Sequence, residues 1–243
     1  MGFWAALQFL TIFPSPLRGT VSAEVSGQSL AYFSLIGLAL GSILLGIWYG
    51  LAFILPPPVV YALLIITLAI LTGAHHLDGL IDTFDGVMAG KDRGERLQTM
   101  ADTKVGAFGI AAIILLLLLK YVALSSAPVV ESLLLMPTLS RWAMVCVIFA
   151  FPYAKNVGMG LVFKQRATWQ RLTAATAIAL VTAVVLLKWW GLVLIAVLLL
   201  IVLGIASCFR LRLGGLTGDN YGAINELAEV LVLLLLIILG RLQ

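Results

Sequence analysis

Long apolar runs constrain this chain more than any other feature of its sequence. The hydrocarbon core of a bilayer is about 30 Å thick, so a helix needs roughly 20 apolar residues to cross it. Seven stretches meet this requirement: Ser29–Leu55, Pro58–His76, Ala107–Ala127, Val130–Pro152, Thr173–Trp190, Gly191–Phe209 and Ala223–Gly240. The sequence therefore predicts an all-α, polytopic integral membrane helix bundle with about seven transmembrane helices.

The composition agrees with this class. The 243 residues are 62% hydrophobic and 11% charged, whereas soluble domains are about 45–50% apolar and about 25% charged. This balance excludes a soluble globular enzyme, a disordered chain and a disulfide scaffold. The length leaves room for one membrane-embedded domain, residues 1–243, without a sizeable extramembrane domain.

The first apolar stretch, Phe3–Phe13, is too short to cross a bilayer. No basic residue precedes it, and Pro14 and Pro16 follow. It therefore lacks the pattern of a signal peptide. We expect an interfacial or re-entrant helix here.

The basic residues predict the orientation of the bundle. With the N-terminus in the cytoplasm, only Lys188 and Arg241 fall outside, while Lys120 and Arg141 lie within spans. The other basic residues are all cytoplasmic in this topology: Arg18, Lys91, Arg93, Arg96, Lys104, Lys155, Lys164, Arg166, Arg171, Arg210 and Arg212. This is a strong positive-inside bias. The formal net charge of +4 is therefore a sign of topology, and it gives no reason to expect a nucleic-acid partner.

Nine of the eleven acidic residues lie in two short segments at the predicted cytoplasmic side. In the first segment Asp78, Asp82 and Asp85 are spaced i, i+4, i+7, so they share one face of a helix. Like charges so placed repel one another unless a cation lies between them, and Mg²⁺ is typically held by a few carboxylates, waters and substrate phosphates. The spacing favours an Mg²⁺–diphosphate site. The alternative is a polar helix end paired with nearby lysines and arginines.

Three neighbouring side chains extend this candidate site. His76 is either a contact for a substrate phosphate or an ordinary interfacial histidine. Asp102 is a further candidate metal ligand, with a helix cap as the alternative. Lys104 could meet phosphate oxygens as a point charge.

The second acidic segment follows a glycine-rich turn, Gly214–Gly218, of a kind that can expose backbone amides to phosphate. Gly215 and Thr217 in this turn, and Asp219 directly after it, are the candidate contacts with substrate. Glu226 and Glu229 lie one turn apart in the last span. The helix dipole explains Glu226 simply, whereas a carboxylate as deep as Glu229 marks a functional site by default.

Arg141 lies in the middle of a predicted span. An arginine there is costly, so we expect it to face the bundle interior and either an acid or a substrate phosphate. A purely structural ion pair is the alternative.

These motifs together resemble one known family. The segment His76–Gly86, which reads HLDGLIDTFDG, is similar to the hallmark of the cobalamin synthases, the adenosylcobinamide-GDP ribazoletransferases. Three other segments agree in order and spacing: Leu7–Pro14, Met100–Gly109 and Gly214–Glu229. One departure is Thr103-Lys104, where many relatives have Ser/Pro-Arg. Lysine keeps the charge but loses the bidentate geometry of arginine.

The resemblance implies an enzyme of the bacterial or archaeal cytoplasmic membrane. Members of the family join adenosylcobinamide-GDP to α-ribazole or its 5′-phosphate and release GMP, with Mg²⁺, in the last steps of cobalamin biosynthesis. The expected partners are these substrates and membrane lipid, with a homo-oligomer left open. The predicted catalytic residues are Asp85, as a base for the hydroxyl proton, Asp82 and Lys104. The predicted metal ligands are Asp78, Asp82, Asp85 and Asp102; the predicted substrate contacts are His76, Arg141, Gly215, Thr217, Asp219, Glu226 and Glu229.

Two other functions compete with this interpretation. A CDP-alcohol phosphotransferase runs the same reaction type on lipids, but neither Asp78-Gly79 nor Asp85-Gly86 is followed by the Ala-Arg of its signature. A cation or metabolite transporter would use intramembrane acids as coupling sites. Transporters commonly show paired repeats and midplane acids, whereas here the acids cluster toward one side and no repeat is evident.

Overall fold

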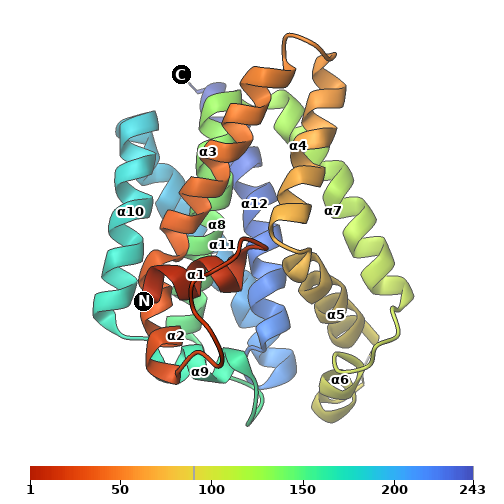
Figure 1. The fold of residues 1–243 in the computed structure, drawn as a ribbon. Helices are drawn as coiled ribbons and strands as arrows, with labels where there is room; N and C mark the ends of the chain where they lie inside the picture. Colours follow the sequence, from red (N-terminus) through yellow and green to blue (C-terminus); the bar gives the residue numbers. More distant parts are fainter. Residues whose placement is uncertain (90, 243) are drawn as a thin grey trace.

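The computed structural model describes residues 1–89 and 91–242, and it is helical throughout, without a strand in that part of the chain (Figure 1). The elements are α1 (Gly2–Leu10), α2 (Ala23–Ser29), the 3₁₀ turn η1 (Leu30–Tyr32), α3 (Phe33–Leu51), α4 (Pro57–Leu71), α5 (His75–Ala89), α6 (Arg93–Thr99), α7 (Ala107–Ser126), α8 (Val129–Ala150), α9 (Met159–Arg166), α10 (Trp169–Leu187), α11 (Trp190–Leu213) and α12 (Gly218–Gly240). The predicted all-α class is confirmed.

Within the described residues, six helical segments are long and apolar enough to span a bilayer: Ala23–Leu51, α7, α8, α10, α11 and α12. Helices α4 and α5 form a pair bent by 88°, which makes a broken seventh span or a re-entrant segment. The prediction of about seven spans agrees with this range. The chain is a multi-pass membrane protein by the length and composition of its helices.

One predicted boundary was wrong. Pro58–His76 was expected to form one span, but α4 ends at Leu71 and α5 begins at His75. Gly73 and Ala74 have φ values of 61° and 56°, a left-handed conformation that a right-handed helix cannot contain. The two positive φ angles turn the chain sharply, and the histidines therefore begin α5 instead of ending α4.

Helices α8 and α12 form the centre of the bundle. In the most apolar stretch of α8, 83% of the residues are buried, and the corresponding share in α12 is 67%. In the other spans it is 44% or less. The outer helix α10 packs inward through a stripe of small residues, Ala175, Ala179 and Ala183, which are fully buried. Small residues let helix backbones approach closely in a membrane, where packing replaces the hydrophobic driving force.

The two ends of the bundle differ in charge. The short helices α2, α6 and α9 lie at one end, whereas the α10–α11 turn and the C-terminus lie at the other (Figure 1). The first end carries the basic loops that were predicted to be cytoplasmic, and Lys188 lies at the opposite end. Helix α1 lies across the bundle near α2 (Figure 1), and its interfacial or re-entrant placement stays a prediction. Which end faces the cytoplasm stays a prediction.

The acidic helix α5 is placed by a close crossing with α12. A Cβ atom on Gly79 would lie 2.7 Å from the carbonyl oxygen of Asp219, and one on Gly222 would lie 3.1 Å from the Cα of His76. Since no side chain separates the helices there, the acids of α5 are brought beside the first turn of α12.

Candidate active site

The three aspartates of α5 lie in different environments, although all are on the helix as predicted. Asp78 is exposed and Asp82 is half-buried, whereas Asp85 is buried. The Asp82 carboxylate is within electrostatic range of the carboxylates of Asp78, Asp219 and Asp85, and Lys155 is the cation that opposes them. Asp82 therefore lies at the centre of a local excess of negative charge.

Asp85 makes hydrogen bonds to the start of α7 that the sequence did not predict. Its two oxygens accept hydrogen bonds from the backbone amides of Gly106, at 2.7 Å, and Gly109, at 2.8 Å. A Cβ on either glycine would collide with this carboxylate. Asp85 thus caps α7 from another helix by satisfying amides that have no intrahelical partner. These contacts do not support its predicted roles as metal ligand and general base.

Asp85→Asn is expected to lower stability more than activity. An amide group can accept only one of the two hydrogen bonds, so one buried backbone amide is left facing an NH₂ group, at a cost of about 1–3 kcal/mol. Thermal unfolding in detergent, measured alongside turnover of the surviving folded protein, tests this. Loss of turnover with an unchanged unfolding midpoint would contradict this prediction and support a catalytic role for Asp85.

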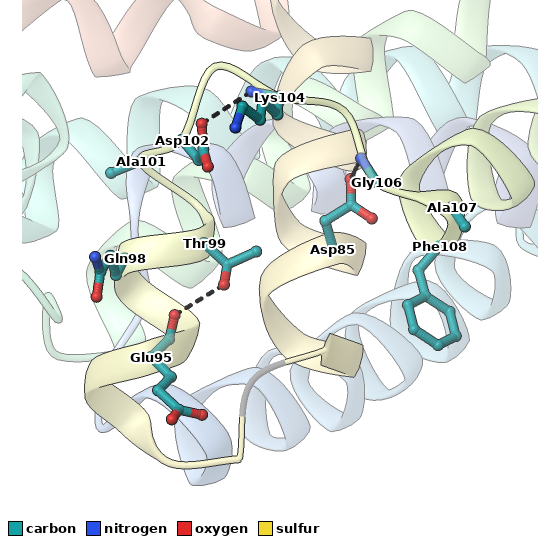
Figure 2. A pocket seen from close by; sticks show the side chains of 10 residues that line it. All are labelled: Asp85, Glu95, Gln98, Thr99, Ala101, Asp102, Lys104, Gly106, Ala107 and Phe108. Atoms are coloured by element: carbon teal, nitrogen blue, oxygen red, sulfur yellow. Dashed lines mark hydrogen bonds between the residues drawn. The ribbon is translucent and has the colours of Figure 1, made fainter.

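One cavity at the end of the bundle that carries the short helices lies beside the C-terminal half of α5. It has a volume of about 770 Å³ and is lined by Asp85, residues of α6, the α6–α7 loop and the start of α7. We call it the Lys104 cavity (Figure 2). Lys104 and Asp102 both line it and are exposed, so the structure brings these two predicted residues into the same cavity as Asp85.

Asp102 does not cap α7, which was the alternative interpretation. Its Oδ1 atom accepts from the backbone amide of Lys104 at 3.1 Å, which closes a local turn. Figure 2 shows this contact across the cavity from Asp85, the residue that does cap the helix.

The second cavity lies at the other end of α5, and we call it the His76 cavity. Its volume is about 630 Å³. It is lined by α1, the start of α5, the α8–α9 loop and the start of α12, and the polar side chains that face it include His75, His76, Tyr153, Lys155 and Asp219. Lys155 Nζ lies 3.4 Å from Asp219 Oδ2. Helix α5 therefore connects two cavities, with Asp78 and Asp82 between its two ends.

The glycine-rich turn contributes to the His76 cavity through its last residues only. Gly218 and Asp219 line the cavity. Thr217 instead caps α12 in a reciprocal capping box with Asn220. Gly215 packs against the backbone of Tyr153 and Ala154, where a Cβ would lie 2.8 Å away. The predicted contacts of Thr217 and Gly215 with substrate therefore have no support in this geometry, because both residues hold the turn in place.

A buried ion network joins three central helices. Lys120 Nζ of α7 lies 2.5 Å from Glu226 and 2.7 Å from Glu229, both on α12. Arg141 of α8 also contacts Glu229. The side chains of all four residues are almost completely buried. Arg141 faces an acid in the bundle interior as predicted, and the geometry favours the structural ion pair over direct contact of Arg141, Glu226 and Glu229 with substrate.

The carboxylates of α5 suit a magnesium ion in chemistry but do not form a cage. Among the described residues, no three histidine, cysteine or acidic side chains are grouped to hold a metal ion. Mg²⁺ is, however, often held by only one or two carboxylates together with substrate phosphates and waters. Asp78 and Asp82, which lie within electrostatic range of the further carboxylates of Asp219 and Asp85, fit that kind of site.

Several residues of the site escaped the sequence analysis. Tyr153 and Phe9 look like ordinary apolar residues of a membrane protein, but both line the His76 cavity. Lys155 was assigned to a basic cytoplasmic loop that could attract an anionic substrate or lipid headgroups, but it was not singled out as a site residue. Asn225 and Lys120 carried a usable signal, since each is a polar residue within an apolar run.

The fold and the site define a polytopic helical membrane protein with an acidic helix between two polar cavities at one end of the bundle. The family model described as cobalamin-5-phosphate synthase matches residues 2–237. The chain belongs to this family, as the resemblance predicted. An adenosylcobinamide-GDP ribazoletransferase of Geotalea daltonii is 39% identical over 98% of this chain and 97% of its own length. The adenosylcobinamide-GDP ribazoletransferase of Desulfitobacterium hafniense is 41% identical over 95% of this chain and 94% of its own length. No solved structure matches this chain.

Proposed function

We propose that this protein transfers the adenosylcobinamide-phosphate group from adenosylcobinamide-GDP to α-ribazole or its 5′-phosphate and releases GMP. The relatives that are similar over nearly their whole length carry the name of this reaction. The structural observation that carries the proposal is the acidic helix α5, which runs between two polar cavities. Two cavities suit a reaction that joins two soluble substrates.

The reaction is an attack by an alcohol on a diphosphate ester. A hydroxyl oxygen of α-ribazole forms a bond to the phosphorus that carries the cobinamide. The bond from this phosphorus to the oxygen bridging to guanylate breaks, and GMP leaves with the electron pair while the hydroxyl proton passes to a base or to water. The main requirement is to stabilise negative charge on the phosphoryl oxygens and on the leaving group.

Asp78 and Asp82 are the residues that would hold Mg²⁺. When bound, the ion would neutralise charge on the diphosphate and orient it. Lys104 in one cavity and Lys155 in the other provide point charges for phosphate oxygens. Asp219 holds the Lys155 ammonium toward the first turn of α12.

The same proposal includes the location of the protein. We place it in the cytoplasmic membrane with the N-terminus inside, so that both cavities open to the cytoplasm where soluble substrates are found. The clustering of basic loops at the cavity end supports this orientation. Membrane lipid then surrounds the spans, and a homo-oligomer stays open.

The test is GMP release by the purified protein in detergent, with adenosylcobinamide-GDP and α-ribazole 5′-phosphate, in Mg²⁺ and in EDTA. We expect GMP and an equimolar cobamide product in Mg²⁺, and neither in EDTA. Restoring Mg²⁺ after EDTA should restore the rate, which controls for damage to the protein. Absence of GMP from folded protein would contradict the proposal, and CDP-lipid with an alcohol acceptor would then test the phosphotransferase alternative.

A further inference from the structure

The buried ion network continues beyond its charged residues to the His76 cavity. Glu229 accepts hydrogen bonds from Lys120, from Arg141 and, at 3.3 Å, from the amide nitrogen of Asn225. The same Asn225 nitrogen lies 3.1 Å from Nδ1 of His76. His76 is 7% exposed, and its ring lines the cavity. A continuous path of polar contacts thus runs from two buried cations to a histidine at the cavity wall.

Glu229 fixes which end of the Asn225 amide faces the histidine. With Lys120 and Arg141 in contact, Glu229 is a carboxylate, and a carboxylate can only accept hydrogen bonds. The NH₂ group of Asn225 must therefore face Glu229. The reversed amide would place its oxygen against the Glu229 oxygen. The observed orientation leaves Asn225 Oδ1 buried without a partner, which is the cost of satisfying Glu229.

The orientation of Asn225 in turn determines the state of the imidazole. Each N–H of the amide donates to one neighbour, Glu229 or His76, so Nδ1 of His76 must accept. A neutral imidazole that accepts at Nδ1 carries its proton on Nε2. In the part of the chain that the structure describes, Nε2 makes no hydrogen bond. The ring therefore offers an N–H donor that no protein group uses, in a cavity that also contains Lys155 and Asp219.

We propose that Asn225 is a positioning residue, which holds His76 as the Nε2–H tautomer so that this ring donates a hydrogen bond to a phosphate oxygen of a substrate in the His76 cavity. The identity of that oxygen rests on the proposed function; the tautomer does not. The ion pairs of Glu229 with Lys120 and Arg141 act as the anchor of the arrangement, because they prevent the carboxylate, and hence the amide, from turning.

The tautomer can be measured without any substrate. The chain contains two histidines, His75 and His76, so ¹⁵N-histidine labelling of His75→Gln gives a single imidazole. Two-bond correlations from the ring carbon-bound protons identify Nε2, and the ¹⁵N shift shows which nitrogen carries the proton. We expect the proton on Nε2. A proton on Nδ1, or on both nitrogens, overturns the proposal.

A variant series tests the cause. Asn225→Ala removes the donor, and we expect both tautomers to appear. Asn225→Asp replaces the donor by an acceptor and should move the proton to Nδ1. Ser140→Ala is the matched control, because it removes another contact of the same network, the 2.9 Å hydrogen bond from Arg141, without touching His76. An unchanged Nε2–H spectrum in folded Asn225→Ala would overturn the role of Asn225.

Turnover provides the functional readout. Loss of one hydrogen bond to a charged oxygen predicts a fall in kcat/KM of about 10- to 100-fold for Asn225→Asp, in which the proton moves to Nδ1. Asn225→Ala, in which the Nε2–H tautomer is still partly populated, should show a smaller fall. Since Asn225 acts through His76, the same substitution should cost nothing further in a His76→Ala background. Equal losses in both backgrounds would overturn the proposal. If the wild type released no GMP, the proposed function would fail, while the tautomer measurement would still decide the role of Asn225.

Discussion

Asp82→Asn is expected to lower turnover by at least about 100-fold while leaving the protein folded. The substitution keeps the shape of the side chain and removes its charge. Asp82 is the carboxylate that the charges of Asp78, Asp85 and Asp219 surround, so its loss removes a ligand from the proposed magnesium site. It also relieves like-charge repulsion, and stability should be unchanged or slightly raised.

The measurement is GMP release at saturating substrate over a series of Mg²⁺ concentrations. Glu131→Gln is the matched control, because Glu131 lies in the first turn of α8, away from both cavities. Like Asp82→Asn, Glu131→Gln replaces one carboxylate by an amide, and this control variant should keep wild-type turnover. A near-wild-type rate for Asp82→Asn would remove this residue from the site.

Glu229→Gln is expected to reduce the free energy of unfolding by about 3–5 kcal/mol. Glu229 is fully buried between Lys120 and Arg141, and an arginine cannot lose its proton in a protein. The substitution therefore leaves a buried guanidinium without its counter-charge. Two nitrogens of Arg141 already lack hydrogen-bond partners, and the hydrogen bond that remains is to the neutral hydroxyl of Ser140.

The double variant Arg141→Met with Glu229→Gln separates charge balance from simple loss of packing. It removes one cation and one anion and leaves the Lys120–Glu226 pair, which is 2.5 Å long. We expect the double variant to be more stable than Glu229→Gln alone, as measured by the midpoint of unfolding in mixed micelles. Additive losses from the two substitutions would show that the charges do not compensate each other.

Much of the fold could be predicted because hydropathy acts locally. A run of about 20 apolar residues predicts a span wherever it occurs, and the predicted runs correspond to the observed helices apart from the break at Gly73 and Ala74. That break escaped the analysis because Thr72-Gly73-Ala74 sits within an apolar run. A single glycine there does not reveal that two consecutive residues adopt positive φ angles.

The sequence predicted which residues lie together on the acidic helix better than it predicted the contacts that their side chains make. The spacing of Asp78, Asp82 and Asp85 placed all three on one helix, which is correct. Spacing cannot show that Asp85 meets the amides of Gly106 and Gly109, more than 20 residues further along the chain. For the same reason a helix cap was the alternative role considered for Asp102, since it lies nearer to α7 in sequence.

By itself, the sequence determined the class of the protein, the helices and the family to which the chain belongs. These properties depend on composition, periodicity and ordered motifs, which are present before any folding. Only the tertiary structure decided which charges meet. Lys120 and Glu226 are separated by 106 residues, and His76 and Asn225 by 149. Buried charges and amides are stabilised only by a partner within hydrogen-bond reach, and the packing of distant helices selects that partner.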